Sequence, residues 1–207
     1  MKSKHPYEPF LPQAATKLII GTMPPPRFCV EPQELLDGDV NFYYGSRDNY
    51  FWDLLAETTG AQLERNNSED AVKQRKDLLT RLNIGITDII KECIHKDGKA
   101  DDASLKEITH KPIKELLLQN PKIDTLIYTS AFVIKLVNQI ADKSYHSWEI
   151  PLKVGSVIIN GKKYNVIVLY SPSPMALRSV DAETRLNQYR NVFGELICVL
   201  PLRAELS

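Results

Sequence analysis

The chain has 207 residues and carries 26 basic and 26 acidic side chains, so its formal net charge is zero. Hydrophobic residues make up 43% of the chain and charged residues 25%, which excludes a disordered or fibrous protein. At roughly 100 to 200 residues per domain, this length predicts a single domain over residues 1–207. The balanced charge excludes a global basic field, so any polyanionic partner must bind a local patch.

The sequence contains no signal for secretion or membrane insertion. Residues 1–12 include three prolines and no apolar core, and no apolar stretch approaches the roughly 18 residues that a membrane span needs. Cys29, Cys93 and Cys198 are widely spaced, which argues against a disulfide framework, a zinc knuckle and a four-cysteine iron–sulfur site. The four histidines show no metal-binding spacing. We therefore expect a cytoplasmic monomer without a metal, a cofactor or a membrane partner.

The first third of the chain predicts a strand followed by two helices. Residues 17–21 (KLIIG) form a short apolar run that ends at glycine and prolines, as expected of a buried strand. Asp48 or Asn49 can cap a helix that stops at Gly60. Ser68 opens a second helix with leucines on one face. A long loop therefore separates the first strand from the first helix.

The middle of the chain predicts further alternation of strands and helices. Residues 84–90 (IGITDII) are interpreted as a strand that turns into a helix. Apolar residues at helical spacing over 113–117 are followed by a strand at 123–128 and by a helix over 133–140.

The last third contains a hairpin and a helix. Asn160-Gly161 supplies the positive backbone angles of a two-residue turn between strands at 154–159 and 164–170. The second arm is the fourth main strand. An amphipathic helix with apolar positions from 186 to 200 follows Ser179 and Asp181 as cap candidates.

This order of elements predicts an α/β fold: a three-layer α/β/α sandwich with a central, mostly parallel four-stranded sheet plus an added hairpin strand. Binding sites in such sheets gather outside the carboxyl ends of the strands. Three loops qualify, namely residues 21–50, the segment from Thr87 onward, and residues 171–179.

Two of these loops carry unusual residues. Residues 41–52 (NFYYGSRDNYFW) place four aromatic side chains before the helix core begins, which indicates either a planar ligand or packing of the loop onto the domain. Residues 171–178 (SPSPMALR) are stiffened by proline and end in Arg178 near a helix N-terminus, which suits a phosphate.

Taken together, four segments resemble the motifs of the uracil-DNA glycosylase superfamily. Residues 18–24 (LIIGTMP) are similar to its first motif, and residues 43–52 (YYGSRDNYFW) resemble the aromatic and Asn-x-Phe-Trp segment of the mismatch-specific and hypoxanthine-DNA branches. Residues 82–88 (LNIGITD) are similar to the middle Gly-x-Thr strand. Residues 169–174 (LYSPSP) resemble the closing motif that enters the DNA minor groove. The four occur in the family's order.

The resemblance implies roles for individual residues. A glycosylase extrudes a nucleotide, holds its base between flat walls and stabilises charge as the glycosidic bond breaks. Tyr44 takes the position of the stacking aromatic, and Asn49 takes the catalytic position, where it reads the base edge or aligns the water, or serves as a helix cap. Met175 or Leu177 fills the gap left by the flipped base, or packs within its loop. The remaining base-binding positions are Gly21, Thr22, Met23, Thr87, Asp88 and Ser171, and the DNA-binding positions are Ser173, Pro174, Met175, Leu177, Arg178 and Arg47, with Arg27 a further phosphate candidate.

The chain also departs from the family pattern. Several branches place a water-activating Asp or Asn where this chain has Met23, and the best-known branch has a histidine where this chain has Ser171. The hypoxanthine branch is similar in both respects, which is why the catalytic role is assigned to Asn49.

These observations favour a cofactor-free DNA glycosylase that removes a deaminated base, uracil or hypoxanthine, from DNA. The alternative is a non-catalytic nucleobase or nucleic-acid binding module of the same fold, which the apolar Met23 and the zero net charge favour. A serine hydrolase is disfavoured because no Gly-x-Ser-x-Gly elbow is present.

Overall fold

The computed structural model describes residues 2–95, 105–147 and 153–194. Its main feature is a six-stranded sheet with the order β3-β2-β6-β9-β8-β7. The first four of these strands are mutually parallel, and β8 and β7 continue the sheet in antiparallel fashion. The strand bounds are β2 Lys17–Gly21, β3 Ile84–Asp88, β6 Thr125–Tyr128, β7 Lys143–Ser147, β8 Lys153–Ile159 and β9 Lys162–Val168.

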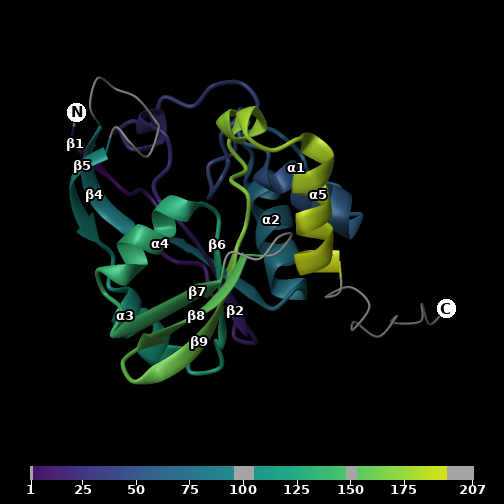
Figure 1. Ribbon diagram of the computed structural model, residues 1–207. Helices are drawn as coiled ribbons and strands as arrows, with labels where there is room; N and C mark the ends of the chain where they lie inside the picture. Colours follow the sequence, from purple (N-terminus) through teal and green to yellow (C-terminus); the bar gives the residue numbers. More distant parts are fainter. Residues whose placement is uncertain (1, 96–104, 148–152, 195–207) are drawn as a thin grey trace.

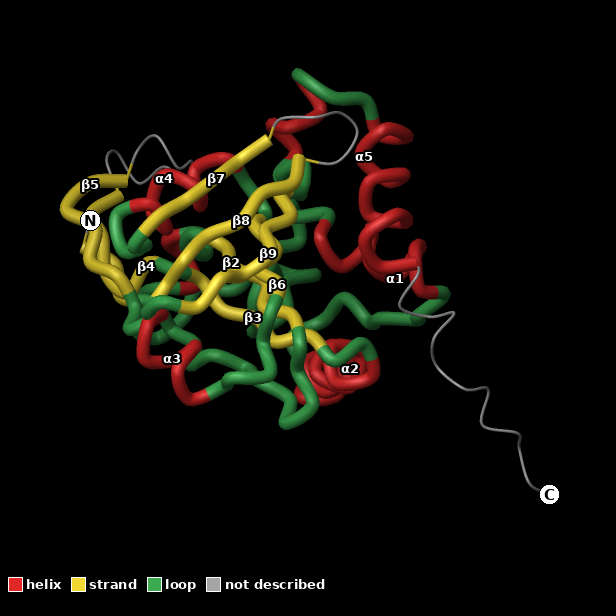
Figure 2. The backbone as a smooth tube through the Cα atoms, turned by 60° about the horizontal axis from the view of Figure 1, so that its bottom comes forward, coloured by secondary structure: helices red, strands yellow, loops and turns green. Residues whose placement is uncertain are grey.

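Helices cover both faces of this sheet (Figures 1 and 2). Ile19 packs in an apolar cluster with the helices α1, α2 and α5, whereas Leu18 and Ile20 pack in a second cluster with α3 and α4. Because successive side chains of a strand point to opposite faces, the apolar run of β2 contributes to both clusters. The predicted three-layer α/β/α sandwich is therefore confirmed. The helix bounds are α1 Phe51–Thr59, α2 Glu69–Arg81, α3 Ile113–Gln119, α4 Ala131–Asn138 and α5 Ala182–Tyr189.

Several helix ends follow their local sequence signals. The Ser68 hydroxyl accepts a hydrogen bond from the Ala71 N–H at 3.1 Å and caps α2, and Asp181 caps α5 in the same way. Gly60 adopts the left-handed conformation that ends α1. Apolar positions predicted beyond residue 194 lie outside the described residues, and a short π-helical turn, Arg190–Gly194, follows α5.

The hairpin is confirmed, with one addition. Asn160 and Gly161 have φ values of 52° and 73°, as the two-residue turn between β8 and β9 requires. A further strand, β7, pairs with β8, so the antiparallel addition is two strands wide. The sequence of β7, KSYHS, is polar and has no strand signal.

The predicted helix after residue 88 is wrong. The chain instead leaves β3 and enters β4 (Ile90–His95), the centre of a second, three-stranded antiparallel sheet with β1 (Lys2–Lys4) and β5 (Leu105–His110). This sheet brings the N-terminal segment against the end of β3, because the His5 N–H bonds to the Lys91 carbonyl at 2.8 Å.

The parallel strands end at a common edge of the main sheet. Gly21 of β2 is the register partner of Asp88 of β3, and Ile20 is the partner of Tyr128 of β6. Two segments cover this edge, residues 22–50 with the short helix Pro26–Phe28, and residues 169–179 with the short helix Pro174–Arg178. Within the described ranges, every helix is too short or too polar to span a lipid bilayer.

Candidate functional site

Tyr44 lies directly over the end of β2. A Cβ atom built on Gly21 would collide with the Tyr44 hydroxyl and with Oδ1 of Asp88, and it would approach Tyr44 Cζ to 2.9 Å. The Tyr44 hydroxyl also forms a hydrogen bond of 2.8 Å with Oγ1 of Thr129, which follows β6. Glycine is therefore needed at position 21 because two side chains approach its backbone closely. Tyr44 itself has a φ of 53°, so the loop bends sharply to place it there.

Asn49 and Tyr44 are linked through Phe51. The Tyr44 ring stacks on the Phe51 ring with centroids 4.5 Å apart and planes inclined by 28°. The Phe51 backbone N–H donates to Oδ1 of Asn49 at 2.9 Å. The N-cap of α1 is Tyr50 and has no side-chain cap, so the prediction of Asp48 or Asn49 as N-cap is wrong. Asn49 instead accepts the N–H of the first helical residue from the position before the cap. Its Nδ2 group makes no hydrogen bond within the described residues.

The closing turn is joined to this helix start. The Tyr50 N–H donates to the Pro172 carbonyl at 3.0 Å. Arg185 of α5 is buried beneath the turn; its Nη1 donates to the carbonyls of Ser171 and Ser173 at 3.4 and 3.3 Å, and its guanidinium lies 5.0 Å from the Tyr50 ring centroid. The structure thus brings the turn next to Asn49.

The short helix of this turn exposes apolar side chains. Met175 and Leu177 are 55% and 42% exposed. Ser173 caps the helix by accepting the Met175 N–H, and Pro174 occupies its first turn. Arg178 is exposed at its last turn and has no ion-pair partner among the described residues. These side chains are available to an external partner.

Asp88 belongs to a buried polar cluster that the motifs did not predict. Its Oδ2 pairs with Nε2 of His5 at 2.8 Å, and the two side chains are 8% and 1% exposed. Lys111 donates from Nζ to Nδ1 of His5 at 3.0 Å, to the Tyr7 carbonyl at 2.8 Å and to the Tyr43 hydroxyl at 3.3 Å. Burial lowers the pKa of Lys111 to about 8, against the opposing pull of Asp88.

This cluster borders a small hollow. A cavity of about 250 Å³ opens between the N-terminal segment and α3, and its lining includes His5, Tyr7 and Lys111. A shallower depression of about 820 Å³ runs along α2 and is lined by none of the predicted site residues.

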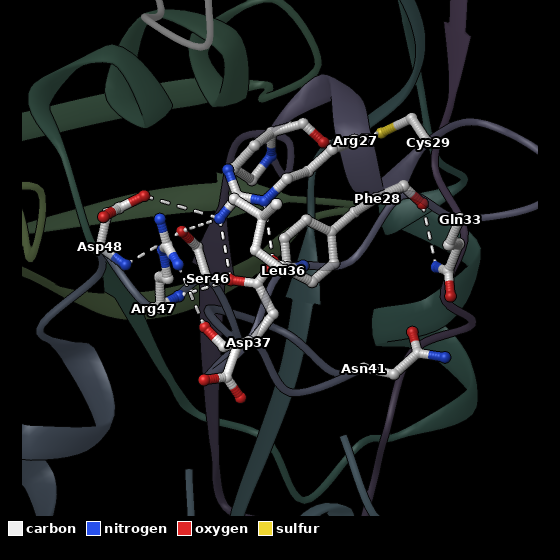
Figure 3. Close-up of polar contacts among 12 residues, drawn as sticks. Arg27, Phe28, Cys29, Gln33, Leu36, Asp37, Asn41, Ser46, Arg47 and Asp48 are labelled. Carbon is white, nitrogen blue, oxygen red and sulfur yellow. Dashed lines mark hydrogen bonds and ion pairs between the residues drawn. The ribbon is translucent and has the colours of Figure 1, made fainter. Parts of the chain in front are cut away.

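Arg27 has a structural role instead of the predicted phosphate contact (Figure 3). Its guanidinium donates to both carboxylate oxygens of Asp39 at 2.8 and 2.9 Å and to the Ser46 hydroxyl at 2.8 Å. Burial raises the pKa of Asp39, but hydrogen bonds from Arg27 and from the Arg47 and Leu36 N–H groups outweigh it and leave the pKa lowered. The pair therefore holds residues 27–46 together.

Arg47 remains more open than Arg27. Its side chain is exposed, with a hydrogen bond of 3.4 Å from Nη1 to the Asp37 carbonyl. Arg178 and Arg47 are thus the predicted phosphate ligands that keep exposed guanidinium groups.

The other predicted base-binding positions differ in their surroundings. Thr22 and Ser171 are partly exposed. Met23 packs against the apolar cluster of α3 and α4. Thr87 is completely buried, and its hydroxyl donates to the Asp88 carbonyl at 3.2 Å.

Sequence reasoning missed four residues of this region. Thr129 orients Tyr44, Arg185 supports the turn, and His5 and Lys111 surround Asp88. His5 lies 83 residues from Asp88 in sequence, and Lys111 lies 106 residues from His5. A lysine or arginine is rarely buried unless it is paired, so the burial of Lys111 and Arg185 points to partners, but this burial is visible only in the folded chain.

The fold and the edge at which these residues meet define an α/β/α sandwich with a candidate site at the carboxyl ends of its parallel strands. A solution NMR structure described as a putative uracil DNA glycosylase from Methanosarcina acetivorans has the same fold. The similarity has a TM-score of 0.60 at 19% sequence identity and covers 95% of this chain and 99% of that chain. No family model and no curated protein matches the chain.

Proposed function

We propose that this protein is a DNA glycosylase that flips a deaminated base, uracil or hypoxanthine, out of DNA and hydrolyses its N-glycosidic bond. The observation that carries the proposal is the meeting of Tyr44, Asn49 and the turn at residues 171–174 at one edge of the sheet. The fold shared with the protein described as a putative uracil DNA glycosylase supports it. Enzymes of this class need an aromatic wall, a polar group at the base and a segment that enters DNA.

Asn49 supplies the polar group. Because Oδ1 accepts the Phe51 N–H, the side-chain amide is held in one orientation and its NH₂ group is left to donate. The departing base gains negative charge as the glycosidic bond breaks, so a fixed donor aimed at a base carbonyl lowers the barrier. This role is compatible with the observed contact at the helix start.

Tyr44 supplies the flat wall. Its ring is braced by Phe51, and its hydroxyl is anchored to Thr129, so the ring loses little freedom when a base stacks on it. Stacking of a base on an aromatic side chain contributes about 1–3 kcal/mol. Gly21, Thr22 and Ser171 complete the base-binding region, with Met23 and Thr87 beneath it as supporting residues.

The turn enters the DNA. Met175 and Leu177 are exposed apolar side chains on a helix anchored from below by Arg185, and one of them occupies the space of the extruded base. Arg178 and Arg47 bind flanking phosphates, with Ser173 and Pro174 shaping the turn. We propose that the enzyme works in the cytoplasm as a monomer without a metal or organic cofactor.

The direct test is a panel of oligonucleotides that carry uracil or hypoxanthine in single and double strands. We expect alkali-labile abasic sites after incubation with at least one member of the panel. Asn49→Asp keeps the acceptor for Phe51 N–H and removes the NH₂ donor, so it should fold normally and lose about 100-fold or more in rate. Asn138→Asp, at an exposed position at the end of α4, is the matched control and should retain full activity.

The alternative is a binding module without catalysis. Met23 favours it, because a thioether in the loop that follows β2 cannot activate water. If the wild type cleaves no member of the panel but binds the same oligonucleotides, the protein is a binding module and not a glycosylase.

A further inference from the structure

The Asp88 carboxylate has two oxygens in different surroundings. Oδ2 accepts a hydrogen bond from His5 on the side of the N-terminal segment. Oδ1 lies over Gly21, beside the Tyr44 hydroxyl, and receives no hydrogen bond from the described residues. One oxygen is therefore anchored, and the other points to the edge where Tyr44 lies.

The hydrogen bonds around His5 fix the position of its proton. Nδ1 lies 3.0 Å from the Lys111 ammonium and 3.1 Å from both the N–H and the carbonyl oxygen of Tyr7. Because an ammonium group can only donate, Nδ1 accepts from it, and we assign the imidazole proton to Nε2, which points to Asp88. Lys111 directs its other N–H groups to the Tyr7 carbonyl and the Tyr43 hydroxyl.

A neutral imidazole is a suitable partner for a proton-accepting carboxylate. It orients the carboxylate by one hydrogen bond without cancelling its negative charge, as a direct arginine pair would. The Lys111 ammonium bonds to His5, on the side of the ring away from Asp88, and makes no hydrogen bond with the Asp88 carboxylate. The arrangement aligns Asp88 and leaves Oδ1 available to accept a proton.

We propose, on the basis of the glycosylase function above, that Asp88 is the catalytic residue that activates the attacking water and that His5 is its positioning residue. The water oxygen forms a bond to C1′ of the deoxyribose as the bond from C1′ to the base nitrogen breaks. One water proton passes to Oδ1 of Asp88, and the bonding electrons leave with the base, which is later protonated by solvent. The negative carboxylate also stabilises the positive charge on the sugar.

The other acidic side chains of this region do not meet these conditions. Asp39 is fully buried and holds Arg27 with both oxygens, and Asp48 is exposed, with Arg27 at 3.6 Å. The apolar Met23 cannot accept a proton. Asp88 is the register partner of Gly21 on the adjacent strand, so it reaches the same edge from a neighbouring position.

The experiment measures single-turnover excision and DNA affinity separately, on whichever base the wild type removes. Asp88→Asn keeps the size of the side chain and its hydrogen bonding but cannot accept the proton. We expect its rate to fall by about 100-fold or more with the dissociation constant changed less than about threefold. Asp124→Asn, at an exposed carboxylate before β6, is the control and should leave both quantities unchanged.

A second pair of variants tests His5 while leaving Asp88 in place. His5→Leu removes the donor to Oδ2, and we expect a fall of about tenfold or more in rate with little change in affinity. His5→Gln carries an amide N–H at a similar distance along the side chain and should recover most of this loss. His110→Leu, on β5, should match the wild type, because no hydrogen bond or ion pair joins His110 to Asp88 in the described residues.

The outcomes separate the two proposals. Inertness of the wild type on the whole panel overturns the glycosylase function and this inference with it. An active wild type whose Asp88→Asn variant keeps its rate overturns this inference alone. If Asp88→Asn fails to fold, the His5 variants decide. Equal excision rates for His5→Leu, His5→Gln and the wild type overturn the inference, and a lower rate for His5→Leu than for His5→Gln supports it.

Discussion

Replacement of Gly21 by alanine tests the close approach on which the site is built. Gly21 does not adopt a positive φ, so its backbone accepts alanine without strain. The added methyl group, however, overlaps the Tyr44 hydroxyl and Oδ1 of Asp88, and it lies 2.9 Å from Tyr44 Cζ. Both side chains must move, and each is held by a hydrogen bond, to Thr129 and to His5 respectively.

The expected cost follows from these contacts. Overfilling a packed site costs about 1–3 kcal/mol, which for a chain of this length lowers Tm by roughly 3–9 °C. A displacement of about 1 Å at the reacting groups costs about 100-fold in rate. Thermal unfolding followed by circular dichroism and single-turnover excision of the best substrate measure the two effects.

Gly60→Ala is the matched control for this experiment. Gly60 has a φ of 68°, and a Cβ there meets nothing within 4 Å, so alanine costs about 1–2 kcal/mol of backbone strain without touching the site. We expect a lowered Tm with unchanged activity. Wild-type stability and wild-type activity in Gly21→Ala would refute the reasoning, because the structure leaves no room for the methyl group.

Three further predictions concern neighbouring parts of the molecule. Asp39→Asn removes the buried carboxylate that holds Arg27 and leaves it only the exposed Asp48 at 3.6 Å, which should cost about 3–5 kcal/mol of stability. Because the pKa of Asp39 is lowered on folding, the stabilisation is present above the unfolded pKa and is lost as pH falls through the folded pKa, which urea unfolding at several pH values will show. The double variant Met175→Ala, Leu177→Ala should weaken DNA binding in a fluorescence anisotropy titration without lowering Tm, because both side chains are exposed. Unchanged binding would mean that the two side chains only pack within their loop. Burial lowers the pKa of Lys111 to about 8, so the unfolded chain binds more protons above that pH; wild-type stability should rise between pH 8 and 10 relative to Lys111→Met, and parallel curves would contradict the assignment.

The parts of the fold that the sequence predicts are those with local signals. The run KLIIG, the Asn160-Gly161 turn and the caps at Ser68 and Asp181 specify their elements because the hydrogen bonds and burial involved depend on a few adjacent residues. The strand Lys2–Lys4 has no such signal. It is polar and is held by backbone pairing with β4, which no apolar pattern reveals.

In the candidate site, too, the residues that the sequence predicts are those with local signals. Tyr44 and Asn49 are adjacent in sequence to the helix that positions them, so a motif suffices to find them. Arg27 shows the limit of such reasoning. An arginine in a long loop fits a phosphate ligand and a loop anchor equally well, and the buried Asp39 that decides between them becomes visible only when the loop is folded.

The sheet explains how this chain can lack an acidic or amide group after its first strand and still present a carboxylate at the same edge. Parallel neighbours in register end together, so β3 places Asp88 beside Gly21 of β2. A carboxylate there must be oriented by a group from outside the sheet, and the N-terminal segment supplies His5 by pairing with β4 immediately after Asp88. The three-stranded sheet therefore has a role in the proposed site, because it holds the partner of the proposed proton acceptor in place.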